Sequence, residues 1–115
     1  PADPNTAPID PNFQGYGVIT TDAEGRYRFK TVKPGAYPVN ADWTRPPHIH
    51  IDVSGKIDRL VTQMFFPDEP LNAKDRVLSR LGTGKESAVA KLLTPTKEIE
   101  REAMLLAWDI VLAKG

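Results

Sequence analysis

Both histidines of this chain lie in one short segment, at positions 48 and 50. Ile49, Ile51 and Val53 alternate with polar residues there, which is typical of a half-buried β-strand. Side chains two positions apart on a strand point to the same face, so the imidazoles of His48 and His50 should lie side by side. Neutral imidazole is a common ligand of iron, zinc and copper. The pair is therefore a candidate metal site, and the alternative is a structural pair bonded to water and backbone.

Further metal ligands must come from other residue types, because the chain has no third histidine and no cysteine. Tyrosine, aspartate and glutamate remain. Asp52 follows His50 by two residues on the same face and is one candidate carboxylate. Arg45 and two prolines lead into the histidine pair, and a Tyr37-Pro38 dipeptide lies upstream. This combination favours a metal site over a structural histidine pair.

The bulk composition fits one domain with one core, over residues 1–115. Fifteen basic and fifteen acidic residues balance, which gives no reason to expect nucleic acid or an anionic membrane as a partner. No apolar run approaches the roughly 20 residues that cross a bilayer, and no secretory or lipidation motif is present. We expect a cytoplasmic protein. The chain opens at Pro1 without a methionine, in a proline-punctuated segment, so we also expect the domain to lack its N-terminal part.

The remaining sequence predicts a mainly β fold. Strands are expected at residues 15–20 and 26–32, paired as a hairpin around a turn at 22–25, then at 36–39, 48–53, 59–66 and 103–112. Residues 40–44, with Trp43, read as a loop, and residues 71–81 as a helix with Asn72 as N-cap and Gly82 beyond its end. Residues 86–93 fit a helical turn or a strand. The expected architecture is a β-sandwich of short antiparallel strands with one or two short helices.

Four segments in fixed order carry a resemblance to a known family: Asp10-Pro-Asn-Phe13, Thr31-Val-Lys-Pro-Gly-Ala-Tyr37-Pro38, Arg45-Pro-Pro-His48-Ile-His50 and Thr62-Gln63-Met-Phe-Phe66. Over about residues 10–112 the chain resembles the intradiol ring-cleavage dioxygenases, in particular their protocatechuate 3,4-dioxygenase branch. The arginine-to-histidine segment is the most specific of the four. The turn with Tyr37 is less specific, because transthyretin-like sandwich modules use similar hairpins.

The resemblance implies a mononuclear non-haem Fe(III) held by two tyrosines and two histidines. Tyr37 matches the second tyrosine of that set, and His48 and His50 match the histidine pair. Asp52 does not match a ligand of the family. A phenolate is a hard anionic donor whose pKa falls far below about 10 when it binds a trivalent cation, which fits this set.

The resemblance also implies residues that act on the substrate. Arg45 matches an arginine that sits over the bound ring, where a guanidinium can stabilise charge developing during the reaction. Gln63 matches a polar residue of the same pocket. Val39 stands where close relatives have a tryptophan, and Trp43 is a candidate to cover that wall instead.

The family's first tyrosine ligand should lie upstream of Pro1. Tyr16 and Tyr27, the other tyrosines of the chain, match no ligand position, and we expect both to be structural. The fourth ligand is therefore expected from a segment before Pro1 or from another polypeptide.

The implied activity is insertion of both atoms of O2 into a catecholic substrate, with cleavage between the two hydroxyl-bearing carbons to give a muconate-type diacid. The implied partners are that small-molecule substrate, O2 and further dioxygenase polypeptide or an oligomer. Alternatives are a non-catalytic homologous subunit, a transthyretin-like binding module, and a cupin-type oxygenase, which would need a later histidine that is absent.

Overall fold

The computed structural model describes residues 15–96 and 103–112, and these form a mainly β structure of short antiparallel strands with few helical turns. The strands are β1 (Tyr37–Asn40), β2 (Trp43–Arg45), β3 (His48–Ser54), β4 (Arg59–Phe65), β5 (Lys91–Leu93) and β6 (Leu105–Ala107). The 3-10 helices η1 (Pro70–Lys74) and η2 (Gly82–Ala88) flank the short helix α1 (Arg76–Ser79). The mainly β prediction is confirmed. In the described residues the strands pair as three two-stranded ladders, β1–β2, β3–β4 and β5–β6.

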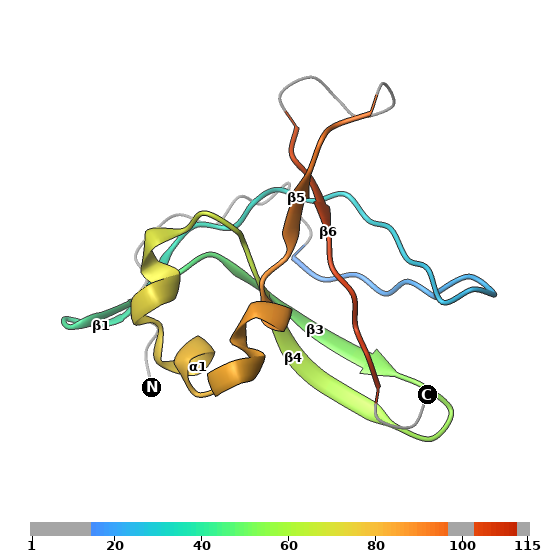
Figure 1. The fold of residues 1–115 in the computed structure, drawn as a ribbon, viewed down its shortest axis with the longest axis horizontal. Helices are drawn as coiled ribbons and strands as arrows, with labels where there is room; N and C mark the ends of the chain where they lie inside the picture. Colours follow the sequence, from blue (N-terminus) through green and yellow to red (C-terminus); the bar gives the residue numbers. More distant parts are fainter. Residues whose placement is uncertain (1–14, 97–102, 113–115) are drawn as a thin grey trace.

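The long β3–β4 hairpin is the centre of the fold, and Figure 1 shows the helical turns on one side of it and β5 and β6 beyond its base. Its register sets His48 opposite Phe65 and His50 opposite Gln63. Directly opposed residues share a face, so these four side chains belong to one face of the hairpin. The expected strands at 48–53 and 59–66 are therefore found almost as predicted.

The two faces of the hairpin are buried against different elements. Met64 packs with Phe66 and Ala90 on one face, and Ile49, Ile51, Leu106 and Trp108 surround that cluster. Phe65, only 1% exposed, packs on the other face with Leu78 of α1 and Ala88 of η2. The helical turns thus cover the Phe65 end of the histidine face, while His50 is exposed.

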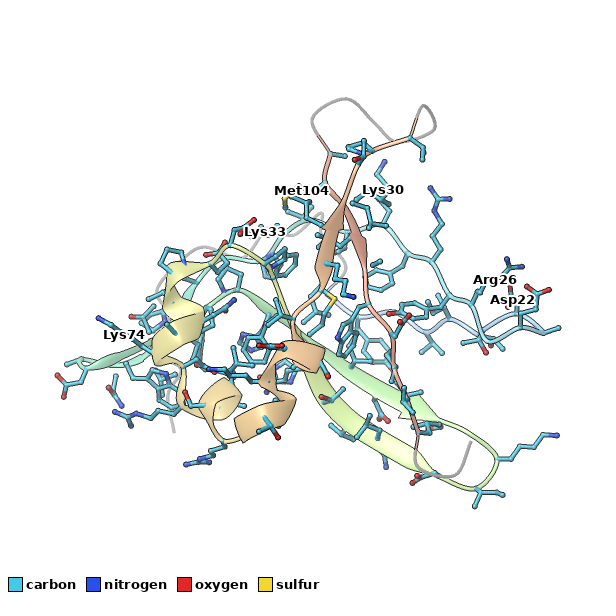
Figure 2. All side chains as sticks on the ribbon, viewed as in Figure 1. Asp22, Arg26, Lys30, Lys33, Lys74 and Met104 are labelled. Carbon is cyan, nitrogen blue, oxygen red and sulfur yellow. The ribbon has the colours of Figure 1, made fainter. Side chains whose placement is uncertain are left out.

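The predicted hairpin of residues 15–20 and 26–32 was wrong, because neither segment forms a strand. Only the turn between them is made: the Asp22 amide donates to the Arg26 carbonyl at 2.9 Å, and Gly25 adopts a positive φ of 79°. Val18 is 78% exposed, so its side chain is barely buried by the described residues. Residues 15–32 form an arm, and Figure 2 shows Asp22 and Arg26 at its outer end, far from Lys74 on the helical side.

The predicted helix at 71–81 was also wrong in its extent. The chain is extended at Asp75, with φ −73° and ψ 127°, and this residue separates η1 from α1. Asp75, and not Asn72, caps the helix, because its side chain accepts the Leu78 amide at 3.0 Å. The Asn72 side chain instead donates to the Phe66 carbonyl at 2.8 Å.

Three other predicted boundaries differ. Trp43 lies in β2 and not in a loop, and the closing strand covers Leu105–Ala107 instead of 103–112. The ambiguous segment at 86–93 is helical to Ala88 and becomes strand β5 at Lys91. The Asp10–Phe13 motif lies outside the described residues. No helix in the described ranges is long and apolar enough to span a membrane.

Candidate metal and substrate site

The histidines line a pocket of about 420 Å³ at the end of the β3–β4 hairpin. Its lining combines two imidazoles, a phenol, a guanidinium and a tight turn, from the residues Pro34, Gly35, Tyr37, Arg45, His48 and His50. These residues come from the turn before β1 and from β1, β2 and β3. The structure therefore brings Tyr37, His48, His50 and Arg45 of the predicted set together.

The two imidazoles lie side by side, with ring centroids 5.1 Å apart. Nδ1 of His48 lies 2.8 Å from the Pro46 carbonyl oxygen, which can only accept, so Nδ1 carries the proton. Nε2 then keeps its lone pair. A histidine that donates one ring N–H to a carbonyl is the arrangement common among metal ligands, since it fixes the ring and the tautomer.

Burial lowers the pKa of His48 below its ordinary 6.5, and the positive charge of Arg45 and the second imidazole of His50 act in the same direction. The Pro46 hydrogen bond and the Asp75 charge oppose this shift without cancelling it. His48 is therefore neutral at pH 7, the form in which imidazole binds a metal.

Tyr37 reaches the pocket through the β1–β2 ladder. The register sets Tyr37 directly opposite Arg45, three residues before His48 in the chain. The short link through Pro46 and Pro47 then turns the chain into β3. The Tyr-Pro and Arg-Pro-Pro motifs thus act as one local unit, which explains why residues 37 and 48 share a pocket.

The turn that forms one wall of the pocket is tied to the segment after β4. Lys33 forms an ion pair with Glu69, and its ammonium lies 5.4 Å from the centroid of the Phe66 ring. Pro34 and Gly35 follow directly and line the pocket. This contact holds the wall against the helical side.

Arg45 is 7% exposed, and all three of its nitrogens have partners. Nε and Nη2 each donate to Asp75 at 3.1 Å. Nη2 also donates to Oε1 of Gln63 at 2.7 Å, and Nη1 lies 3.3 Å from Nε2 of His48. The guanidinium also lies over the ring of Phe65, 5.8 Å from its centroid.

Asp75 is a residue of this site that the sequence prediction missed. It is fully buried, and its carboxylate accepts from Arg45, from Trp43 Nε1 at 3.3 Å and from the Leu78 amide. Burial by itself raises the pKa of Asp75, but these hydrogen bonds, that of Arg45 first, lower it below its ordinary value. Asp75 follows Leu71 by four residues and precedes Leu78 by three, so an acidic residue on the apolar face of the expected helix was the available signal.

Gln63 and Trp43 contact Arg45 and are not among the residues that line the pocket. The guanidinium carbons of Arg45 and Arg76 lie 5.8 Å and 4.9 Å from the Trp43 ring centroid. Trp43 thus lies behind Arg45, on the side of α1, while Gln63 fixes the guanidinium from β4.

The other candidate ligands lie elsewhere. Asp52 forms an exposed ion pair with Arg59 at 2.7 Å. Tyr16 is 77% exposed, and the hydroxyl of Tyr27 donates to the Trp108 carbonyl at 2.6 Å. Within residues 15–96 and 103–112, no three histidine or carboxylate side chains gather as a metal site.

The donors present nevertheless fit a ferric ion. Two imidazoles and one phenol, next to a buried cation, make a set in which only Tyr37 can supply a negative charge, by losing its proton. Fe(III) accepts such mixed nitrogen and phenolate donors, and a second anionic ligand would offset more of its positive charge.

Comparison with known proteins identifies the class. The family model described as "Dioxygenase" matches residues 2–114. The chain therefore belongs to the intradiol ring-cleavage dioxygenase family.

Among its relatives, a protocatechuate 3,4-dioxygenase beta chain from Burkholderia cepacia is 47% identical over 119 residues, covering 96% of this chain and 48% of the relative. A hydroxyquinol 1,2-dioxygenase from Rhizobium sp. (strain MTP-10005) is 36% identical over 60% of this chain and 28% of its own length. A catechol 1,2-dioxygenase from Candida albicans (strain SC5314 / ATCC MYA-2876) is 32% identical over 58% of this chain and 27% of its own length. The chain thus spans about half the length of the first of these relatives and less of the others. Membership of this family argues against the transthyretin-like and cupin alternatives.

Proposed function

We propose that this polypeptide supplies the greater part of the active site of a non-haem Fe(III) intradiol dioxygenase. The observation that carries the proposal is the single pocket lined by Tyr37, His48 and His50 beside the buried Arg45. Family membership supports the same reading, since the relatives are named as dioxygenases of protocatechuate, hydroxyquinol and catechol. The substrate is proposed to be a catechol, bound next to Arg45.

In this proposal Tyr37, His48 and His50 hold the iron. The ferric ion, when bound, draws electron density from a chelated catecholate and so makes the ring reactive toward O2. His48 contributes Nε2, because its Nδ1 proton is committed to the Pro46 carbonyl. Tyr37 contributes its phenolate oxygen, and its negative charge offsets part of the metal charge.

Arg45 acts on the substrate through N–H groups that point to the pocket. Its Nη1 lies beside His48, so a ring chelated at the metal would lie within its reach. A donor held at a fixed position stabilises charge that develops in the transition state without reorganising during the reaction. Because Arg45 is nearly excluded from water, this effect is stronger than it would be on the surface.

The fourth ligand is proposed to be a tyrosine outside this sequence. Tyr16 and Tyr27 lie away from the pocket, and the chain spans 48% of the Burkholderia cepacia relative. A tyrosine upstream of Pro1, or on an associated dioxygenase polypeptide, would supply the second phenolate.

We propose that the chain associates with further polypeptide, because it exposes many large apolar side chains. The arm of residues 15–32 and the β5–β6 pair expose large apolar side chains: Tyr16, Val18, Ile19, Phe29, Val32, Leu92 and Leu93. Soluble domains rarely leave so many together in water. The relative is named a beta chain, which fits a protein that works with a second kind of chain.

The experiment uses the full-length protein with any chain that copurifies. The iron-loaded protein should be red-brown, because charge transfer from tyrosinate to Fe(III) absorbs visible light. It should also consume one O2 for each protocatechuate, hydroxyquinol or catechol opened to a diacid. An iron-loaded protein that is coloured but opens none of these rings would favour a different substrate or the non-catalytic subunit. A protein that binds no iron would overturn the proposal.

A further inference from the structure

We propose that Asp75 is the positioning residue of Arg45, and that it fixes both the direction and the effective charge of the guanidinium at the pocket. This inference rests on the proposed function and assigns a role to a residue outside the pocket lining. Asp75 sits between η1 and α1, on the helical side of the molecule. It therefore links the helical turns to the end of β2.

Each oxygen of the Asp75 carboxylate accepts two hydrogen bonds. Oδ1 accepts from Arg45 Nε at 3.1 Å and from Trp43 Nε1 at 3.3 Å. Oδ2 accepts from Arg45 Nη2 at 3.1 Å and from the Leu78 amide at 3.0 Å. Both oxygens thus hold the guanidinium side-on, and both are themselves fixed by a second donor.

A side-on pair removes the rotational freedom of a guanidinium, because two parallel N–H groups must stay aligned with two oxygens. In Arg45 the N–H groups of Nε and Nη2 form this pair with Asp75. The second N–H of Nη2 donates to Gln63 at 2.7 Å. Nη1, beside His48, is left on the pocket side. Asp75 therefore decides which N–H groups a substrate meets.

The pair also changes the charge that the pocket experiences. Arg45 and Asp75 are both buried, so each compensates the other at close range in a medium of low polarity. A substrate near Arg45 then meets directed N–H groups with little net positive charge. Such a group is expected to affect the rate of the chemical step more than the affinity for an anionic substrate.

The Asp75→Asn substitution tests this role. Asparagine caps a helix as well as aspartate does, so the Leu78 contact is retained while the charge and one oxygen acceptor are lost. In the full-length iron-loaded protein we expect iron content and visible colour to match the parent. We expect kcat with protocatechuate to fall at least about tenfold, since a displaced catalytic group of this kind can cost up to about 100-fold. The Kd of protocatechuate measured without O2 should change less than about threefold.

A matched control separates positioning from loss of stability. Ile51 lies on the opposite face of β3, against Met64 and Phe66, and Ile51→Ala should destabilise the protein without changing kcat of the folded fraction. If Asp75→Asn behaves like Ile51→Ala, with kcat within about twofold of the parent, the positioning role is refuted.

A structural readout keeps the inference testable if the parent opens no catechol ring. In a crystal structure of Asp75→Asn, the guanidinium of Arg45 should have left its contact with Oε1 of Gln63. If the guanidinium keeps that contact in the variant, Asp75 does not position it. Absence of turnover in the parent would count against the proposed function alone.

Discussion

The proposed chemistry depends on a few residues whose protons and charges are fixed by close neighbours. The Pro46 carbonyl selects the tautomer of His48 and leaves Nε2 with its lone pair, and the Asp75 carboxylate holds the guanidinium of Arg45 beside that nitrogen. The local sequence Arg45-Pro-Pro-His48 contains most of this arrangement. Asp75, thirty residues away, supplies the remainder.

Removal of either imidazole should remove the iron. In His48→Ala and His50→Ala one donor is lost, and no other histidine of this chain can replace it. We expect iron per protein, measured by plasma emission, to fall at least about tenfold, by analogy with the loss of metal affinity on removal of supporting groups. Ile49→Val, on the opposite face of the same strand, is the control and should keep its iron. Full iron in either alanine variant would exclude that histidine as a ligand.

Removal of the guanidinium should spare the iron and slow the reaction. Arg45→Ala is expected to keep the visible colour while kcat falls about 100-fold, the cost typical for loss of a fixed donor near developing charge. Because the substitution leaves Asp75 buried without its counter-charge, kcat is measured per folded, iron-bearing molecule. Arg45→Lys keeps the positive charge but loses the planar set of N–H donors, and should give an intermediate kcat. Equal kcat for Arg45→Ala and parent would refute the role.

At the scale of the elements, the site joins two local units and one distant contact. The β1–β2 and β3–β4 ladders bring Tyr37, Arg45 and the histidines together through short turns. The helical turns then close over Phe65 and insert Asp75 behind Arg45. Figure 1 shows these turns between the β1–β2 hairpin and the base of β4.

The stability that Asp75 contributes should depend on pH. Its pKa is lowered in the folded protein, while the unfolded value is about 3.9. The unfolded state therefore binds more protons in acid, so the contribution is complete above the unfolded pKa and is lost as pH falls through the folded pKa.

Urea unfolding of parent and Asp75→Asn at neutral pH and near pH 3.5 measures this contribution. At neutral pH the variant should unfold with about 3 kcal/mol less free energy, the scale for breaking a buried ion pair. The difference should shrink in acid. Asp52→Asn, in the exposed pair with Arg59, is the control and should change little. A difference that stays constant or grows in acid would contradict the assignment.

Sequence periodicity predicted the two strands β3 and β4 well, because Ile49, Ile51 and Val53 give the first of them one apolar face. It failed for residues 15–32, where alternation was clear but no sheet pairs with either segment in the described structure. Alternation indicates which side chains form an apolar face. The surface that buries this face need not belong to the same polypeptide. It also failed at residue 75, because the pairing with Arg45 spans thirty residues and leaves no local periodicity.

At the scale of the whole molecule, the described structure is more open than a compact domain. Its radius of gyration is 15.5 Å, whereas a compact chain of this length would have about 13 Å. The exposed apolar arm and the β5–β6 pair account for this shape. Both fit a polypeptide that packs against further dioxygenase chain, where the fourth ligand is expected.

Location of the iron in the full-length protein tests the account most directly. Anomalous scattering at the iron edge, recorded from crystals of the assembled protein, identifies the metal without reference to turnover. We predict one iron about 2.1 Å from the Tyr37 oxygen and from one nitrogen each of His48 and His50. We also predict a second tyrosine oxygen at a similar distance, from upstream of Pro1 or from an associated chain. Iron bound elsewhere, or bound here without Tyr37, would contradict the account.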